Sequence, residues 1–116
     1  MSDTTTTAHG HSAFLQLETT SDVEAVLRAD GPQVLFLRDP WCPVSRDADN
    51  EMYDLGIAVP TIDVSVQHDL KQLVERETTI RHESPQVIVV RGGRPVWHAS
   101  HYGITREAVA RALAAD

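Results

Sequence analysis

The sequence predicts an α/β domain with a central mixed sheet of four to five strands flanked by helices. Three observations support this class. The apolar run at residues 33–37 has the length of a buried strand. Residues 86–91 and 94–99 flank Gly92-Gly93, a pair that suits a two-residue hairpin turn. The order of elements places a βαβ crossover half before a ββα half.

The first third of the chain contains one helix between two strands. Phe14, Leu15 and Leu17 predict a short edge strand, and the Ser-x-x-Glu spacing at residues 21–24 predicts the capping box that opens a helix. Gly31-Pro32 ends this helix. Residues 33–37 then form the central strand.

A second helix is predicted after Asp39-Pro40, which ends the central strand. Pro43 suits the first helical position, where its missing N–H costs nothing, and Cys42 is therefore the N-cap. The helix is expected to continue to about Asp54, with Gly56 ending it and an inner face formed by Val44, Ala48 and Met52.

The remaining elements complete the pattern. Residues 59–64 predict a strand and residues 67–77 an amphipathic helix. After the hairpin, residues 104–115 predict a final helix with Thr105 near its cap. The resulting order is that of the thioredoxin fold, and residues 13–116 are expected to form one such domain.

The N-terminal residues and the composition of the chain argue against several classes of protein. Residues 1–12 are polar and lack the apolar run of a secretory signal or a membrane span, so we expect a disordered tail and no membrane partner. His9 and His11 in this tail are too weak a pair to predict a metal site. The net charge of −7, without clustered cations, argues against nucleic acid. A single cysteine allows no intrachain disulfide, which favours a reducing cytoplasm.

Cys42 is the candidate nucleophile. A cysteine at a helix N-terminus faces unpaired N–H groups and the positive end of the helix dipole, and both favour thiolate. Ser45 lies one turn further on, where dithiol relatives have a second cysteine, and its hydroxyl could donate to the sulfur. Nearby carboxylates oppose thiolate formation and two arginines offset them: Asp39, Asp47, Asp49, Arg38 and Arg46.

Two alternatives remain open at this site. A lone cysteine is often a buried, inert side chain, although a turn into a helix is an unusual place for a core residue. Trp41 suits a half-buried lid over the core and a substrate contact equally well. If Cys42 reacts, the second sulfur must come from a small thiol or a partner protein, so the chemistry is monothiol.

The segment Trp41-Cys42-Pro43-Val44-Ser45 resembles the Thr-Cys-Pro-Ile-Ser motif of monothiol bacilliredoxins. The segments 82–87 (His-Glu-Ser-Pro-Gln-Val) and 96–101 (Val-Trp-His-Ala-Ser-His) resemble the C-terminal block of the same family. The resemblance extends over about residues 14–113. It departs from the family at Trp41, where threonine is usual and thioredoxins have tryptophan.

The resemblance implies a thioredoxin-like fold and the removal of bacillithiol from mixed disulfides on oxidised proteins. Cys42 would become bacillithiolated, and another thiol, or a regenerating reductase, would restore it. Bacillithiol is thus a co-substrate, and no tightly bound cofactor is implied. The resemblance also implies a cis Pro85, which would leave the backbone of Ser84 free to pair with an extended substrate. An ordinary trans proline is the alternative.

The hairpin should return the chain to the end of the sheet that carries Cys42. His101 and Tyr102 could therefore line the thiol pocket, and the helix start at Gly103 and Thr105 could offer N–H groups to the malate carboxylates of bacillithiol. His98 is expected to be a packed or surface histidine. His82 and Glu83 could orient the Pro85 loop or act on Cys42.

Two rival functions remain. One is a deglutathionylating or general monothiol reductase, and the other is a non-catalytic thioredoxin-fold adaptor. Iron-sulfur carriage is disfavoured because Pro43 does not reproduce the Cys-Gly-Phe-Ser type of loop.

Overall fold

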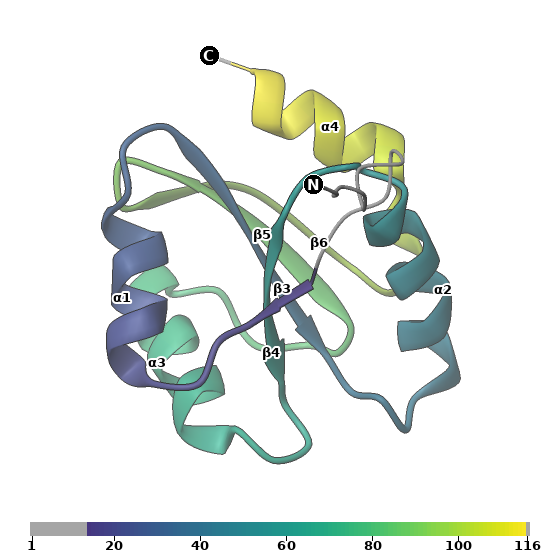
Figure 1. The fold of residues 1–116 in the computed structure, drawn as a ribbon, viewed down its shortest axis with the longest axis horizontal. Helices are drawn as coiled ribbons and strands as arrows, with labels where there is room; N and C mark the ends of the chain where they lie inside the picture. Colours follow the sequence, from purple (N-terminus) through teal and green to yellow (C-terminus); the bar gives the residue numbers. More distant parts are fainter. Residues whose placement is uncertain (1–13, 116) are drawn as a thin grey trace, which may run out of the picture.

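The computed structural model describes residues 14–115. They form a five-stranded mixed sheet with the strand order β2-β4-β3-β5-β6 (Figure 1). The strands are β2 (Phe14–Gln16), β3 (Pro32–Arg38), β4 (Val59–Asp63), β5 (Gln86–Arg91) and β6 (Arg94–Ser100). β2 and β3 pair with β4 in parallel, whereas β3–β5 and β5–β6 are antiparallel. The predicted thioredoxin-like topology is confirmed, with the predicted central strand, β3, in the middle.

Four helices cover the two faces of the sheet in pairs (Figure 1). They are α1 (Thr20–Arg28), α2 (Pro43–Tyr53), α3 (His68–Thr78) and α4 (Arg106–Ala114), with a short 3₁₀ turn, η1 (His101–Gly103), before α4. α1 and α3 pack on one face, while α2 and α4 pack on the other. Among the residues described, no helix is long and apolar enough to cross a membrane.

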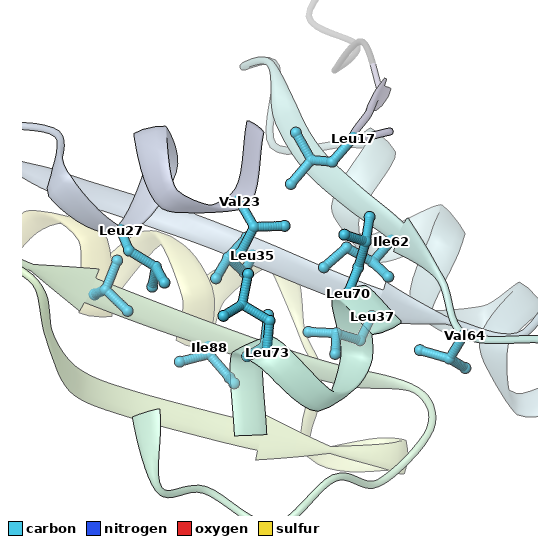
Figure 2. Close-up of a cluster of buried hydrophobic side chains, with 12 residues drawn as sticks. Leu17, Val23, Leu27, Leu35, Leu37, Ile62, Val64, Leu70, Leu73 and Ile88 are labelled. Atoms are coloured by element: carbon cyan, nitrogen blue, oxygen red, sulfur yellow. The ribbon is translucent and has the colours of Figure 1, made fainter. Parts of the chain in front are cut away.

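Each face of the sheet has its own apolar core. Figure 2 shows the first core, in which Val23 and Leu27 of α1 and Leu70 and Leu73 of α3 pack toward Leu35 of β3. The second core joins α2 and α4 to the other side and includes Phe36, Ala48, Met52 and Val109. Four consecutive residues of β3, 34–37, are buried, because helices cover both faces of the central strand.

The start of α1 differs from the prediction. The capping box is formed by Thr19 and Asp22, not by Ser21 and Glu24. Thr19 Oγ1 accepts from the N–H of Asp22 at 3.1 Å, and the Asp22 carboxylate accepts from the backbone N–H groups of Glu18 and Thr19. Those N–H groups lower the pKa of Asp22, with Glu18 contributing most. A threonine followed by a short acidic side chain closes the box two residues earlier than expected.

The hairpin between β5 and β6 has the predicted turn. Gly92 and Gly93 have φ of 61° and 81°, the left-handed geometry that a two-residue turn of this kind requires and that glycine adopts without a steric penalty. The strands pair evenly except at one point. Val89 lies opposite Trp97 and Val90 opposite Pro95, so Val96 is an extra residue that forms a β-bulge.

Candidate active site

Cys42 lies in the loop that leads from the end of β3 into α2, and Asp39 organises this loop. The Asp39 carbonyl accepts from the N–H of Cys42 at 3.0 Å, and its carboxylate accepts from the N–H of Trp41 at 2.9 Å. The N–H of Asp39 donates to Ser45 Oγ at 3.2 Å. Three hydrogen bonds from one residue therefore hold the backbone around Cys42 in a fixed turn.

The predicted N-cap position of Cys42 is confirmed. Its backbone is extended, Pro43 follows at the first helical position, and the thiol is partly exposed without a capping hydrogen bond. Pro43 has no N–H, and the N–H of Ser45 donates to the Cys42 carbonyl at 3.0 Å. The N–H of Val44 has no acceptor within residues 14–115. An N-cap side chain ordinarily accepts a hydrogen bond from this donor, but the Cys42 side chain makes no such bond in this structure.

Ser45 is fully buried on the inner face of α2, together with Ala48 and Met52. The prediction placed Val44 on this face, but Val44 is only half-buried, because residues 45, 48 and 52 form the stripe that faces the sheet. The Ser45 hydroxyl oxygen accepts the N–H of Asp39. Within residues 14–115 the hydroxyl hydrogen has no acceptor, and its donation to the Cys42 sulfur stays a prediction.

An ion pair anchors α2 to the end of β3. Arg38 Nε and Nη2 donate to the two carboxylate oxygens of Asp49 at 2.6 and 2.7 Å. The hydrogen bond to Asp49 raises the pKa of Arg38 despite partial burial. The positive charge of Arg38 therefore offsets the negative charge of Asp49 in this bidentate ion pair.

Asp39 acts as a hydrogen-bond acceptor in the loop and Asp49 as an ion-pair partner, whereas the sequence predicts both only as charges that oppose the thiolate. The signal for Asp39 was its place before Pro40, where an aspartate often accepts from the N–H two residues on. The pairing of Arg38 with Asp49 depends on the angle between strand and helix, which no local pattern encodes.

The Trp41 side chain is almost fully exposed, with 84% of the residue's surface accessible to solvent. The alternative that it forms a lid over the core is therefore wrong. An indole held out beside Cys42 presents a large apolar surface to whatever approaches the thiol.

The predicted cis peptide between Ser84 and Pro85 is confirmed. Pro85 comes directly before β5, whose first residue, Gln86, pairs with Leu37 of β3. Pro85 therefore lies at the end of the sheet from which the Cys42 loop begins. The hairpin returns there as predicted, because Gln86 lies opposite Ser100 and the N–H of His101 donates to the Pro85 carbonyl at 3.0 Å.

His82 and Glu83 hold the segment before Pro85 on two sides. The N–H of His82 donates to the Glu75 carboxylate on α3 at 2.8 Å. The Glu83 carboxylate accepts from the Ser100 hydroxyl, which lowers the pKa of Glu83, and lies 3.6 Å from His101 Nδ1. The side-chain contacts of Glu83 favour the alternative in which it orients the Pro85 loop, whereas His82 contributes its backbone N–H to the position of this loop. His98 is exposed on the surface, which is one of the two environments that the sequence predicts for it.

The surroundings of His82 are expected to make the stability of the fold depend on pH. Its Nδ1 and the Ser84 hydroxyl oxygen are buried without a hydrogen-bond partner in residues 14–115. Burial, followed by the charge of Lys71, lowers the pKa of His82, while Glu75 and Glu83 oppose this shift. The folded chain therefore binds a proton at His82 less readily than the unfolded chain does.

We predict that the His82→Gln variant loses less stability on acidification than the native chain. The unfolded state takes up its proton near pH 6.5, the ordinary histidine value, so the cost begins as the pH falls through that value. Urea unfolding at pH 7.5 and at pH 5.5 measures the difference. The exposed residue His98, changed to Gln, is the matched control. An identical pH response of H82Q and H98Q would contradict the assignment.

Three of the predicted ligand-binding residues meet in one pocket of about 320 Å³ between α2, η1 and the start of α4. His101, Tyr102 and Thr105 line it together with Asp47 and Glu51. Gly103 and Cys42 are not part of its lining. Asp47 follows Cys42 by five positions, so this edge of the pocket lies about 7.5 Å along the helix from the cysteine.

The start of α4 already holds a carboxylate. The N–H of Arg106 donates to Glu51 Oε1 at 2.7 Å, and Thr105 Oγ1 accepts from the N–H of Ala108 at 3.1 Å. The predicted anion site is thus occupied by a side chain of α2. An incoming carboxylate would have to displace Glu51 or bind beside it. No cluster of three or more metal-ligating side chains occurs in the part of the chain that the structure describes, and His9 and His11 lie outside it.

A thioredoxin-like sheet with a partly exposed cysteine at the cap of the helix after the central strand defines this chain as a thioredoxin-fold protein of the oxidoreductase class. The family model described as Monothiol bacilliredoxin BrxC matches residues 15–109. The chain belongs to the monothiol bacilliredoxin family.

Solved structures share the same fold. A protein described as having a thioredoxin fold superposes with a TM-score of 0.78 at 23% identity, covering 86% of this chain and 93% of that one. A thioredoxin variant from Halobacterium salinarum NRC-1 gives 0.66 at 15% identity, with 94% and 93% covered. Thioredoxin from Trypanosoma brucei brucei gives 0.66 at 12% identity, with 94% and 92% covered.

Proposed function

We propose that this chain removes bacillithiol from mixed disulfides on oxidised proteins in the cytoplasm, with Cys42 as the nucleophile. The observation that supports this best is the partly exposed Cys42 at the cap of α2, next to the N–H of Val44, which has no acceptor within the described residues 14–115. A helix N-terminus is a favourable place for a thiolate, and the thiolate is the attacking form. Membership of the monothiol bacilliredoxin family supports bacillithiol as the thiol.

The exchange needs two steps because the chain has one cysteine. The Cys42 thiolate attacks the bacillithiol sulfur of the mixed disulfide, a Cys42–bacillithiol disulfide forms, and the protein thiolate leaves and takes a proton from water. A second bacillithiol, as thiolate, then attacks the bacillithiol sulfur of this adduct. Cys42 is released as thiolate, and bacillithiol disulfide leaves for a separate reductase.

Substrate contacts are proposed on both sides of the sulfur. Trp41 offers an exposed apolar surface before Cys42, which suits the protein part of the mixed disulfide. Ser84, before the cis peptide, offers its backbone to an extended segment of the substrate. The pocket with His101, Tyr102 and Thr105 is proposed to receive the small thiol, with the helix start at Gly103 behind it.

Glu51 is expected to weaken the binding of an anionic thiol in this pocket. Its carboxylate takes the Arg106 N–H that a ligand carboxylate would use, and Asp47 adds a second negative charge. The Glu51→Gln variant keeps an oxygen acceptor but removes the charge. We predict that KM for a bacillithiolated protein falls by about threefold to tenfold, the range of one charge interaction at partial exposure.

The matched control is Glu107→Gln, which removes an exposed carboxylate from the same helical turn without touching the Arg106 N–H. A mixed disulfide with uncharged mercaptoethanol should respond to neither variant. If E51Q leaves KM for the bacillithiolated protein unchanged, or raises it, the start of α4 is not the binding site of the thiol.

The identity of the thiol is tested by competition. One substrate protein is prepared with bacillithiol and, separately, with glutathione, and kcat/KM is measured for both. The proposal expects a clear preference for bacillithiol. Equal or better use of glutathione would identify a general monothiol reductase, and no turnover of either would favour an adaptor without catalysis.

A further inference from the structure

A second pocket lies between β6 and α4, at the turn end of the hairpin and away from Cys42. Its volume is about 600 Å³, within the range of small-molecule sites. Val96 and Trp97 of β6 and Ala108 and Ala112 of α4 form its apolar walls. None of these residues belongs to the proposed exchange site.

The shape of this pocket has a local cause. Neighbouring residues of a regular strand point to opposite faces, so only one of Val96 and Trp97 would ordinarily face α4. Val96 is the extra residue of the β-bulge, and both side chains line the pocket. Across from them, α4 presents two alanines one turn apart, whose short side chains leave the space unfilled.

The rim of the pocket is cationic. Its lining contains three of the ten lysines and arginines in the chain: Arg91, Arg94 and Arg111. Within residues 14–115, no carboxylate lines it. Arg91 donates to the Ala115 carbonyl. Arg94 and Arg111 are exposed and have no ion-pair partner within residues 14–115. The chain as a whole has a net charge of −7, so this local excess of cations beside an apolar wall attracts anions to a surface that is otherwise mostly negative.

We propose that this pocket binds a small amphipathic anion, with one carboxylate on an aliphatic body. Guanidinium groups match carboxylates in geometry and charge, so Arg94 and Arg111 hold the head. The indole of Trp97 and the aliphatic side chains of Val96, Ala108 and Ala112 cover the body. The function is ligand binding at a site separate from thiol exchange.

The test is titration of the full chain with decanoate, below the concentration at which it forms micelles, by isothermal calorimetry. Fluorescence of Trp97 in a Trp41→Phe background gives a second reading. We expect saturable binding at one site and none for decyltrimethylammonium, which has the opposite charge. Changing both Arg94 and Arg111 to Gln should weaken binding by about tenfold or more, and Ala108→Phe should block it by filling the pocket.

The matched control changes Arg28 and Arg76 to Gln, which removes two exposed charges from α1 and α3, and should leave decanoate binding unchanged. The proposal is overturned if decanoate does not saturate, if the cationic amphiphile binds equally well, or if the rim variants bind like the control. Self-association of the chain that Ala108→Phe abolishes would assign the groove to a second copy, and would overturn it as well.

Discussion

Replacing Cys42 with serine is expected to reduce disulfide exchange to the uncatalysed rate. Every step of the proposed reaction forms or breaks a bond at this sulfur, and the chain has no other cysteine to take over. A serine hydroxyl is not ionised at neutral pH and forms no disulfide. Release of bacillithiol from a bacillithiolated protein, followed by mass spectrometry, measures the loss.

Two controls separate chemistry from folding. Cys42 is only partly buried and caps α2 without a side-chain hydrogen bond, so C42S should unfold at nearly the native temperature. Alkylation of the native chain with N-ethylmaleimide should stop the reaction to the same extent, because Cys42 is the one thiol available. Substantial activity in C42S would mean that the nucleophile lies elsewhere and that the site has been assigned wrongly.

Replacing Phe36 with alanine is expected to cost about 3–5 kcal/mol of unfolding free energy. Phe36 is fully buried in the central strand and belongs to the core that supports Ala48 and Met52 on α2. A domain of this size has a total stability of about 5–15 kcal/mol. F36A should therefore lose much of its stability, and with it the fixed position of the helix that begins at Cys42.

The matched control is Phe14→Ala. Phe14 contacts Phe36 edge-on, with ring centroids 5.8 Å apart, but lies on the edge strand and is 37% exposed. The same substitution should cost clearly less there, and urea unfolding of both variants gives the comparison. Equal losses would mean that the core around Phe36 does not carry the stability assigned to it.

The fold was predictable because its signals are local and agree with one another. The apolar run of β3, the Gly92-Gly93 turn and the helical stripes each specify one element, and the order of elements leaves few ways to arrange the sheet. The cap of α1 moved to Thr19 and Asp22 because several polar residues there can cap a helix. The sequence around the start of a helix does not show which of these polar residues will be the cap.

The features of the site that depend on neighbouring residues in the sequence were predictable. The features that depend on contacts between distant parts of the chain were not. Cys42 at the cap of α2 follows from Pro43 and the preceding turn. The carboxylate of Glu51 on the N–H of Arg106 joins residues 55 positions apart, and it depends on how α2 packs beside α4. The exposure of Trp41 depends likewise on the path of the whole loop.

The role of Cys42 as the nucleophile is tested most directly by the intact mass of the chain after a single turnover with a bacillithiolated protein, in the absence of free thiol. We expect one bacillithiol adduct per chain, located on Cys42 by peptide mapping, together with an equal amount of reduced substrate protein. An unmodified Cys42 beside substrate that stays bacillithiolated would contradict it.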